Sequence, residues 1–365
     1  MNTSEIPTPP VELQQSLSWF PGSMMEACPA CKSVFLVSSV RSKQSCPICY
    51  QSELEPQPSL VRKEVPEMLA PIEIDQQNLG ERLTAFLDGV PYKTDDLTVE
   101  NLLKRIQVVW WPQWLVDADL EGEWSGTVGF DYQVRTAKER YGDQGWNSQS
   151  VLRTEIRYEP RMGLLKRHYD NILVPALPTD KARIQQLGAY DYNRSKNFKI
   201  GILEQASVQM PGIEPQELQE AAENTLRHYA EKEILQAAGA QHRREINYRG
   251  AYKNLNWTQF LLPVYSSYYV DEKGLRHPVV MNAQTGRLYG RRLASIKKAR
   301  NWTIGLAALP VLVFLVSLLV AVFSTSNSAA CVTGIAILLG LLSLIPLFRA
   351  ASWNRRQEET ISQFQ

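Results

Sequence analysis

The stretch NWTIGLAALPVLVFLVSLLVAVFSTSNSAACVTGIAILLGLLSLIPLF, residues 301–348, contains no Asp, Glu, Lys, Arg or His over 48 positions. A helix that spans a bilayer needs roughly 20 apolar residues, so this stretch is too long for one crossing and about right for two. Trp302–Phe323 and Ala329–Phe348 each meet the requirement, and the small polar residues 324–328 separate them. The sequence therefore predicts a two-helix transmembrane hairpin over residues 300–349, with a buried hairpin of a soluble core as the alternative.

Positive side chains flank both predicted spans, whereas the connection between the spans carries no charge. Lys and Arg near the ends of spans mark the cytoplasmic face of a membrane. We therefore expect the N-terminal portion and a tail over residues 350–365 to lie on the cytoplasmic side of the inner membrane. The flanking residues are Arg291, Arg292, Lys297, Lys298 and Arg300 before the first span, and Arg349, Arg355 and Arg356 after the second.

The first 25 residues hold no Lys or Arg and no apolar core. This composition lacks the features of a secretory signal, and it predicts a disordered tail over residues 1–22. The large N-terminal portion is thus expected in the cytosol, where thiols stay reduced.

Four cysteines form two C-x-x-C pairs with 14 residues between them, namely Cys28 with Cys31 and Cys46 with Cys49. Each pair can bring two thiolates to one metal through a tight turn, and two pairs complete the tetrahedron that Zn²⁺ prefers in closed structural sites. Disulfides are disfavoured by the compartment, and a redox C-x-x-C is disfavoured by the presence of two matched pairs. We therefore predict a zinc ribbon over residues 23–54, in which a structural Zn²⁺ supplies most of the folding free energy.

Zinc ribbons are also found in nucleic-acid-binding proteins, so the charge balance matters. Residues 1–60 contain three basic side chains (Lys32, Arg41 and Lys43) against five acidic ones, and the whole chain has a net charge of +1. Phosphate contacts dominate affinity for nucleic acids, and a binding module normally shows a basic stripe. A membrane-bound nucleic-acid-binding regulator is therefore the alternative function, and the charge balance disfavours it.

The segment between the cysteines and the apolar stretch predicts an α+β body. Residues 55–71 are proline-bearing and typical of a semi-rigid linker. Residues 72–295 are long enough to bury a core, as one body or as two modules over 72–180 and 181–295. Three alternating segments predict an antiparallel meander with one polar face; they are Val108–Leu120, Thr127–Arg135 and Leu152–Tyr158.

Local signals predict further elements of this body. Leu79, Leu83, Phe86 and Leu87 share a helical face, Thr98 is a candidate N-cap for a second helix, and a long helix is expected from Glu214 to Gly239. The last soluble element is a predicted three-strand meander over Phe260–Val270, Val279–Met281 and Arg287–Tyr289, in which Asn282 and Gly286 supply the turn.

Reaction motifs are missing from the sequence. It contains no H-E-x-x-H, G-x-x-x-x-G-K-[ST], G-x-G-x-x-G or G-x-S-x-G string, and the four histidines lack metal-ligand spacing. Asp117 and Asp119 form a D-x-D that a hydrolase or transferase could use with Mg²⁺, but two carboxylates on one strand face are commonly just solvated. We therefore expect no enzymatic activity and name no catalytic residue.

Several strings occur in order before the apolar stretch, and together they resemble a known family. They are Cys28-x-x-Cys31, Cys46-x-x-Cys49, Trp111-Pro112-Gln113-Trp114-Leu115-Val116-Asp117-Ala118-Asp119, Leu261-Leu262-Pro263-Val264-Tyr265 and Met281-Asn282-Ala283-Gln284-Thr285-Gly286-Arg287-Leu288-Tyr289-Gly290. This order is similar to that of bacterial membrane proteins with a TFIIB-type zinc ribbon, often mislabelled as primosomal helicase fragments. The chain departs from the family pattern at Tyr265, commonly Trp, and at Ala283, commonly Gly.

The resemblance carries expectations about function. Some relatives are encoded beside phage-shock-protein-A-like and SPFH/flotillin-like membrane proteins, which implies a scaffold in envelope maintenance without enzymatic activity. The predicted function is a membrane-anchored adaptor, in which the ribbon on its linker captures a partner and the hairpin holds the complex at the cytoplasmic face of the membrane.

Overall fold

The computed structural model describes residues 23–38, 44–57, 66–142, 145–199, 206–323 and 328–362. The predicted disordered tail over residues 1–22 lies outside them. The chain divides into two compact units: unit 1 comprises Met1–Pro112, Leu177–Gly212 and Leu261–Gln365, and unit 2 comprises Gln113–Ala176 and Ile213–Phe260. This division differs from the sequential modules 72–180 and 181–295, because the long strands β5 (Gln107–Gly142) and β9 (His242–Val270) each contribute residues to both units.

Unit 1 is built on a large sheet with the strand order β11-β10-β9-β5-β8-β2-β1-β3. The pairs β1–β2, β1–β3 and β2–β8 are antiparallel, whereas β5 and β8 run parallel. The remaining strands of this path are β1 (Ser23–Ala27), β2 (Val34–Ser38), β3 (Glu55–Pro56), β8 (Ser207–Gln209), β10 (Arg276–Asn282) and β11 (Leu288–Gly290).

The predicted three-strand meander is confirmed by β9, β10 and β11, which pair antiparallel in sequence order. Its second turn forms as expected from the sequence. The Asn282 side-chain oxygen accepts hydrogen bonds from the amides of Gln284 (2.9 Å) and Thr285 (3.0 Å), and Gly286 has a φ of +78°. That backbone conformation favours glycine.

Two parts of the predicted linker 55–71 are strands of the sheet, Glu55–Pro56 and Pro66–Leu69, so the linker prediction is wrong for them. β3 pairs with β1, while β4 (Pro66–Leu69) pairs with β7 (Lys196–Asn197) and β9. The amide of Ala70 also donates to the carbonyl of Leu261 at 3.0 Å. Prolines do not prevent this, because Pro56 and Pro66 stand at strand ends, where proline is tolerated.

The helices of unit 1 follow their sequence signals. In α2 (Gln76–Leu87), Leu79, Leu83 and Leu87 are buried, and Asp75 caps the N-terminus. Thr98 caps α3 (Val99–Lys104), as predicted, by accepting from the amide of Asn101. Two further helices in the described part of unit 1 are α4 (Asp180–Leu187) and η2 (Tyr192–Arg194).

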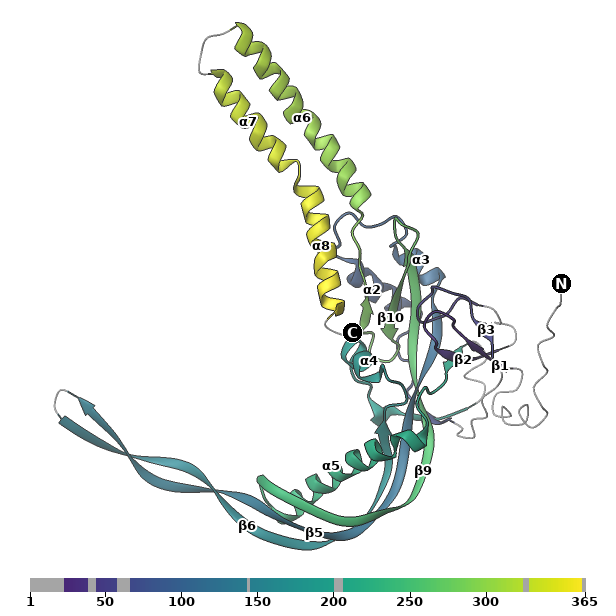
Figure 1. Ribbon diagram of the computed structural model, residues 1–365, viewed down its shortest axis with the longest axis vertical. Coiled ribbons are helices and arrows are strands. Elements are labelled where there is room, and N and C mark those ends of the chain that lie inside the picture. Colours follow the sequence, from purple (N-terminus) through teal and green to yellow (C-terminus); the bar gives the residue numbers. More distant parts are fainter. Residues whose placement is uncertain are drawn as a thin grey trace. The chain divides into compact units, whose positions relative to one another are not determined.

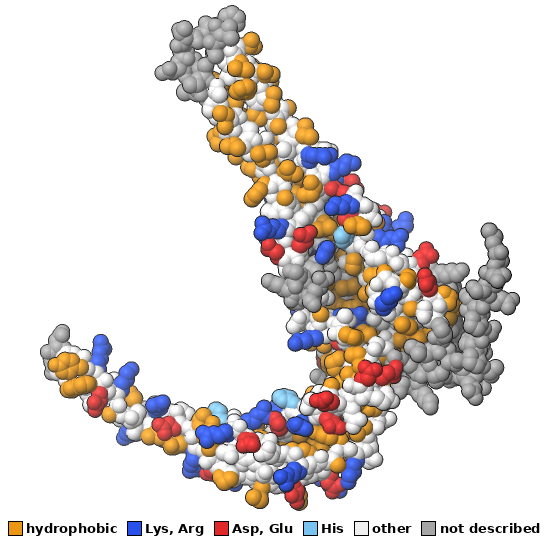
Figure 2. Space-filling view, in the orientation of Figure 1, with side chains coloured by type: hydrophobic (Ala, Val, Ile, Leu, Met, Phe, Trp, Pro, Cys, Tyr) orange, Lys and Arg blue, Asp and Glu red, His pale blue; other side chains and the backbone are white. Residues whose placement is uncertain are grey.

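Three helices close unit 1: α6 (Ile296–Phe323), α7 (Ser328–Leu342) and α8 (Ile345–Ser362). Two segments, Ile296–Leu319 and Val332–Glu359, are long and apolar enough to cross a membrane. Figure 2 shows apolar side chains over the described parts of α6 and α7, with charged groups toward the end at which α6 begins. The predicted tail 350–365 is helical as far as Ser362, as the continuation of α8. Pro346 does not interrupt this helix, because it falls in the first turn, where proline is tolerated.

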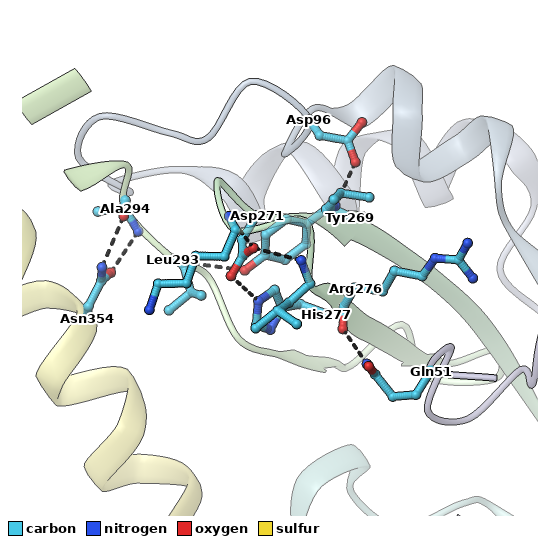
Figure 3. Close-up of polar contacts among 12 residues, drawn as sticks. Gln51, Asp96, Tyr269, Asp271, Arg276, His277, Leu293, Ala294 and Asn354 are labelled. Carbon is cyan, nitrogen blue, oxygen red and sulfur yellow. Dashed lines mark hydrogen bonds and ion pairs between the residues drawn. The ribbon is translucent and has the colours of Figure 1, made fainter. Parts of the chain in front are cut away.

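The end of α8 packs on the segment that leads into α6. The Trp353 indole donates to the carbonyl of Arg292 at 2.6 Å, and the Arg292 guanidinium lies 5.6 Å from the Trp353 ring. The Asn354 side chain makes two hydrogen bonds with the backbone of Ala294, at 2.8 Å and 3.0 Å (Figure 3). These contacts hold α8 against the short segment from which α6 begins.

Replacing Trp353 with Ala should release the C-terminal half of α8 from this segment. Because the change removes a half-buried aromatic ring and a hydrogen bond, we expect the local opening free energy to fall by about 3 kcal/mol. Hydrogen exchange of residues 291–295 and 350–360 would measure it. Arg355→Ala is the matched control: Arg355 is exposed and pairs with Glu359 of the same helix, so exchange should not change.

Unit 2 holds a long antiparallel ribbon of β5 and β6 (Gly145–Val174), whose pairing runs from Trp114↔Val174 to Gly142↔Gly145. The predicted meander over Val108–Leu120, Thr127–Arg135 and Leu152–Tyr158 is therefore wrong, because the first two segments belong to one strand. Gly122 and Gly126 lie between these two segments. They allow β9 to approach, since a Cβ at Gly122 would collide with the backbone of Gly250 and one at Gly126 with that of Glu245.

Helix α5 (Gln219–Ala238) covers part of this ribbon (Figure 1). As predicted, it follows Glu214-Pro215, here as the short helix η4 (Pro215–Leu218), and ends at Gly239 in the left-handed conformation with a φ of 65°. Ala222, Leu226 and Ala230 pack with Trp114 and Val116 in one buried cluster. This cluster is the core of unit 2.

Candidate metal centre

Each C-x-x-C pair forms the same tight turn. The amide of Lys32 donates to the carbonyl of Cys28 at 2.9 Å, and the amide of Tyr50 donates to the carbonyl of Cys46 at 3.0 Å. Lys32 and Tyr50 both have a positive φ, of 61° and 56°. The two pairs therefore reach the site through equivalent backbone geometry, which turns both sulfurs of a pair to one side.

The four sulfur atoms lie together, within 4.8 Å of one another. The Cys28 and Cys49 sulfurs are 3.5 Å apart, and those of Cys31 and Cys46 are 3.6 Å apart. Four sulfurs bound tetrahedrally at about 2.3 Å from a Zn²⁺ would be separated by about 3.8 Å. The structure thus confirms that the four predicted cysteines come together and could hold a metal ion.

The thiols in this cluster affect one another strongly. The contact with the Cys31 sulfur raises the pKa of Cys46, and the same contact lowers the pKa of Cys31. The Cys31 sulfur also raises the pKa of Cys49 to about 11. Four thiolates in this space need a cation, so metal binding must displace protons.

Polar contacts fasten the second C-x-x-C turn to the sheet of unit 1. The Tyr50 hydroxyl donates to the Ser266 hydroxyl (2.9 Å), which in turn donates to the carbonyl of Pro47 (2.5 Å). Arg276 donates to the Tyr50 carbonyl (3.2 Å), and the Gln51 side chain donates to the carbonyl of Arg276 at 2.9 Å (Figure 3). Together with the β2–β8 pairing, these bonds make the cysteine module part of the unit 1 sheet.

Tyr50→Phe should loosen this attachment. Tyr50 is buried, and its burial raises the pKa of the hydroxyl to about 12, so the group stays neutral and hydrogen-bonded. Removing the hydroxyl takes away the donor to Ser266 and the acceptor for Gln107, which is expected to lower the free energy of unfolding by about 1–2 kcal/mol. Denaturant titration would measure the change. Tyr141→Phe alters an exposed tyrosine and should leave stability unchanged.

Sequence reasoning missed Tyr50, Ser266 and Arg276. Tyr50 directly follows the fourth cysteine, so its place after the turn was a usable signal. Ser266 and Arg276 are more than 200 positions away from Tyr50, on the paired strands β9 and β10, so their contacts with Tyr50 depend on long-range folding.

Asp117 and Asp119 are occupied by contacts within unit 2. Asp117 accepts from the amide of Asn171 at 2.8 Å, beside the irregularity of the β5–β6 register. Asp119 accepts from Asn254 (2.7 Å) and pairs with His168 (2.7 Å), and both contacts lower the pKa of this carboxyl. Asn171 and Asn254 have positive φ values, so their backbone departs from the regular strand conformation. The hydrogen bonds to Asp117 and Asp119 stabilise these two irregular positions.

The histidines that looked isolated in the sequence are paired in three cases. His168 contacts Asp119, His242 contacts Asp131 and His277 contacts Asp271 (Figure 3). Each pair joins neighbouring strands or the two sides of a turn, so sequence spacing gave no signal for the first two. None of these histidines belongs to the cysteine cluster.

No protein-family model, curated protein or solved structure is significantly similar to this chain. The arguments for its function therefore rest on the metal centre, the apolar helices and the exposed surfaces.

Proposed function

We propose that this protein is a membrane-anchored adaptor that organises partner proteins at the cytoplasmic face of a bacterial inner membrane. In this proposal the cysteine module is a zinc ribbon, α6 and α7 with the start of α8 are a transmembrane hairpin, and the exposed part of the β5–β6 ribbon holds the partner. Three sets of observations support it.

The donor set supports a structural Zn²⁺. All four groups are thiolates, which favour Zn²⁺ or iron–sulfur chemistry over Mg²⁺ or Ca²⁺. Four protein ligands fill a tetrahedron and leave no position for water, so the metal would serve folding. Cys28 and Cys46 are fully buried, as expected for ligands of a structural site.

The C-terminal helices support an anchor. Large apolar side chains such as Ile304, Leu319 and Phe348 are exposed on them, and lipid is the solvent that such a surface requires. The charged groups stand at the two outer ends of the apolar segments, before Asn301 and after Phe348. By the positive-inside rule both ends would be cytoplasmic, together with the metal centre and both units.

The observation that carries the adaptor role is the exposed apolar surface of the β5–β6 ribbon. Met162 and Leu164 are 83% and 81% exposed, and Leu152 is 63% exposed. Tyr141 and Trp146 form an exposed edge-to-face pair near the hairpin turn. Figure 2 shows charged groups of both signs among apolar side chains along the β5–β6 ribbon. A partner with an apolar stripe bordered by mixed charges would cover this surface. Near Tyr141 and Trp146 the described ribbon consists of β5 and β6, and a two-stranded ribbon alone is only marginally stable.

Site-specific photo-crosslinking in membranes would test this role. A photoreactive residue at Met162 or Leu164 should give a discrete adduct with one protein, and Met162→Asp should reduce that protein's recovery in mild detergent at least fivefold. The matched control is a photoreactive residue at Lys138, on the same ribbon. An equal adduct pattern at Lys138, or recovery that Met162→Asp leaves unchanged, would contradict the proposal.

The family resemblance suggests which partners to look for first. Phage-shock-protein-A-like and SPFH-like membrane proteins are the candidates, and a role in envelope maintenance follows from them. Mass spectrometry of the Met162 adduct would identify the partner directly.

A further inference from the structure

A pocket of about 480 Å³ opens in unit 1 beside the metal centre. Ile48 and Cys49 of the second C-x-x-C turn line one side of it, and β10, β11 and α4 supply other parts. Trp111, Val280 and Tyr289 give it apolar walls. Its volume is in the range of small-molecule sites.

The polar lining of this pocket is positively charged. Arg183, Arg276 and Arg291 contribute guanidinium groups, and no Asp or Glu belongs to its described lining. Arg276 is partly occupied, because its Nη1 donates to Ser45 and to the carbonyl of Tyr50. His277 also lines the pocket and is held by Asp271 at 2.9 Å. The pocket therefore offers a site for a negative group.

Two buried donors of the lining lack a partner within the described parts of the chain. They are the Arg183 Nη1 and the Trp111 Nε1, which come from α4 and β5. The Arg183 guanidinium lies 4.0 Å from the Trp111 ring centroid, and burial lowers the pKa of Arg183 to about 10. The charge of Asp180 acts on Arg183, but its carboxylate accepts from the amide of Leu177. Buried donors without an acceptor are rare in folded proteins and point to a missing ligand.

We propose that this pocket binds a small organic anion, whose carboxylate or phosphate accepts hydrogen bonds from Arg183 and Trp111. The apolar or aromatic body of the ligand lies against Val280 and Tyr289. Guanidinium groups suit such anions because they present several donors in one plane. Since Cys49 and Gln51 also line the pocket, the bound ligand contacts the turn that holds the metal. The site is separate from the apolar ribbon of the proposed adaptor function.

Calorimetry on the full-length, metal-loaded protein in nanodiscs tests this inference with 1-naphthyl phosphate as the probe. Inorganic phosphate supplies the charge alone, and 1-naphthol supplies the aromatic body alone. We expect saturable binding of 1-naphthyl phosphate, at least tenfold tighter than binding of either of the other two. Empty nanodiscs correct for partition into lipid.

Arg183→Met should weaken binding of 1-naphthyl phosphate at least tenfold, while Lys181→Met, which removes an exposed charge from the same helix, should leave it unchanged. Trp111→Phe keeps the ring against Arg183 but removes the donor, and it should weaken binding about fivefold. This variant covers the case in which Arg183→Met fails to fold. Absence of saturable binding, tightest binding of 1-naphthol, or equal affinity in Trp111→Phe and the unaltered protein would overturn the inference.

Discussion

Cys46→Ser is expected to reduce the bound Zn²⁺ from about one per chain to nearly none. Zn²⁺ bound by four thiolates contributes about 10–16 kcal/mol to the folding of small zinc modules, which is more than such a module can derive from its own core. Cys46 is also fully buried, as expected for a ligand of a structural site. Elemental analysis of the purified protein measures this loss directly.

The same substitution should have a structural effect limited to part of the chain. Because β2 pairs with β8 and Tyr50 bonds to Ser266, amides of β1, β2 and β8 should exchange rapidly once the metal is lost. Amides of α5, whose core lies within unit 2, should keep their protection. Cys331→Ser is the matched control, since it removes the cysteine of the second apolar segment of the sequence and should retain the metal. Full metal content in Cys46→Ser would contradict a four-thiolate site.

Placing two arginines in α6, by Leu312→Arg and Leu315→Arg, is expected to abolish stable membrane association. Both positions lie near the middle of the first apolar segment and are more than half exposed. A charged side chain at the centre of a span costs about 2.5–3.5 kcal/mol on insertion scales. Two arginines therefore make insertion of the first apolar segment unfavourable. Carbonate extraction should find the variant in the soluble or degraded fraction.

Leu312→Ala with Leu315→Ala is the control for this pair. It alters the same two positions but keeps them apolar, so the protein should remain in the carbonate-resistant membrane fraction. If the arginine variant also remained there at the level of the unaltered protein, the segment would not cross lipid. A buried position in a soluble core would instead make both variants unstable in solution.

Local signals explain what the sequence predicted well. The C-x-x-C spacing determines both cysteine turns, Thr98 and Gly239 mark helix ends, and Asn282 with Gly286 determines a turn. Each depends on a few neighbouring residues. The apolar composition of residues 301–348 is similarly independent of the rest of the fold, and it alone was enough to predict two apolar helices.

Long-range pairing explains what the sequence did not reveal. Gly122 and Gly126 had to be placed against β9 before their role in close strand contact could be recognised. Residues 55–71 resembled a linker because the partners of β4 lie more than 100 positions away. Arg183 and Trp111 are likewise separated by 72 positions, so their stacked contact in the pocket could not be inferred from spacing.

Labelling of single introduced cysteines in intact cells tests the central claim most directly, namely that the C-terminal helices cross the membrane twice and leave the metal centre in the cytosol. In a chain carrying Cys331→Ala, we would compare Ser326→Cys, between the two apolar segments, with Gln357→Cys in α8. An impermeant maleimide should label Ser326→Cys in intact cells and Gln357→Cys only after permeabilisation. Labelling of Gln357→Cys from outside, or of neither position until the cells are opened, would contradict the two-span arrangement.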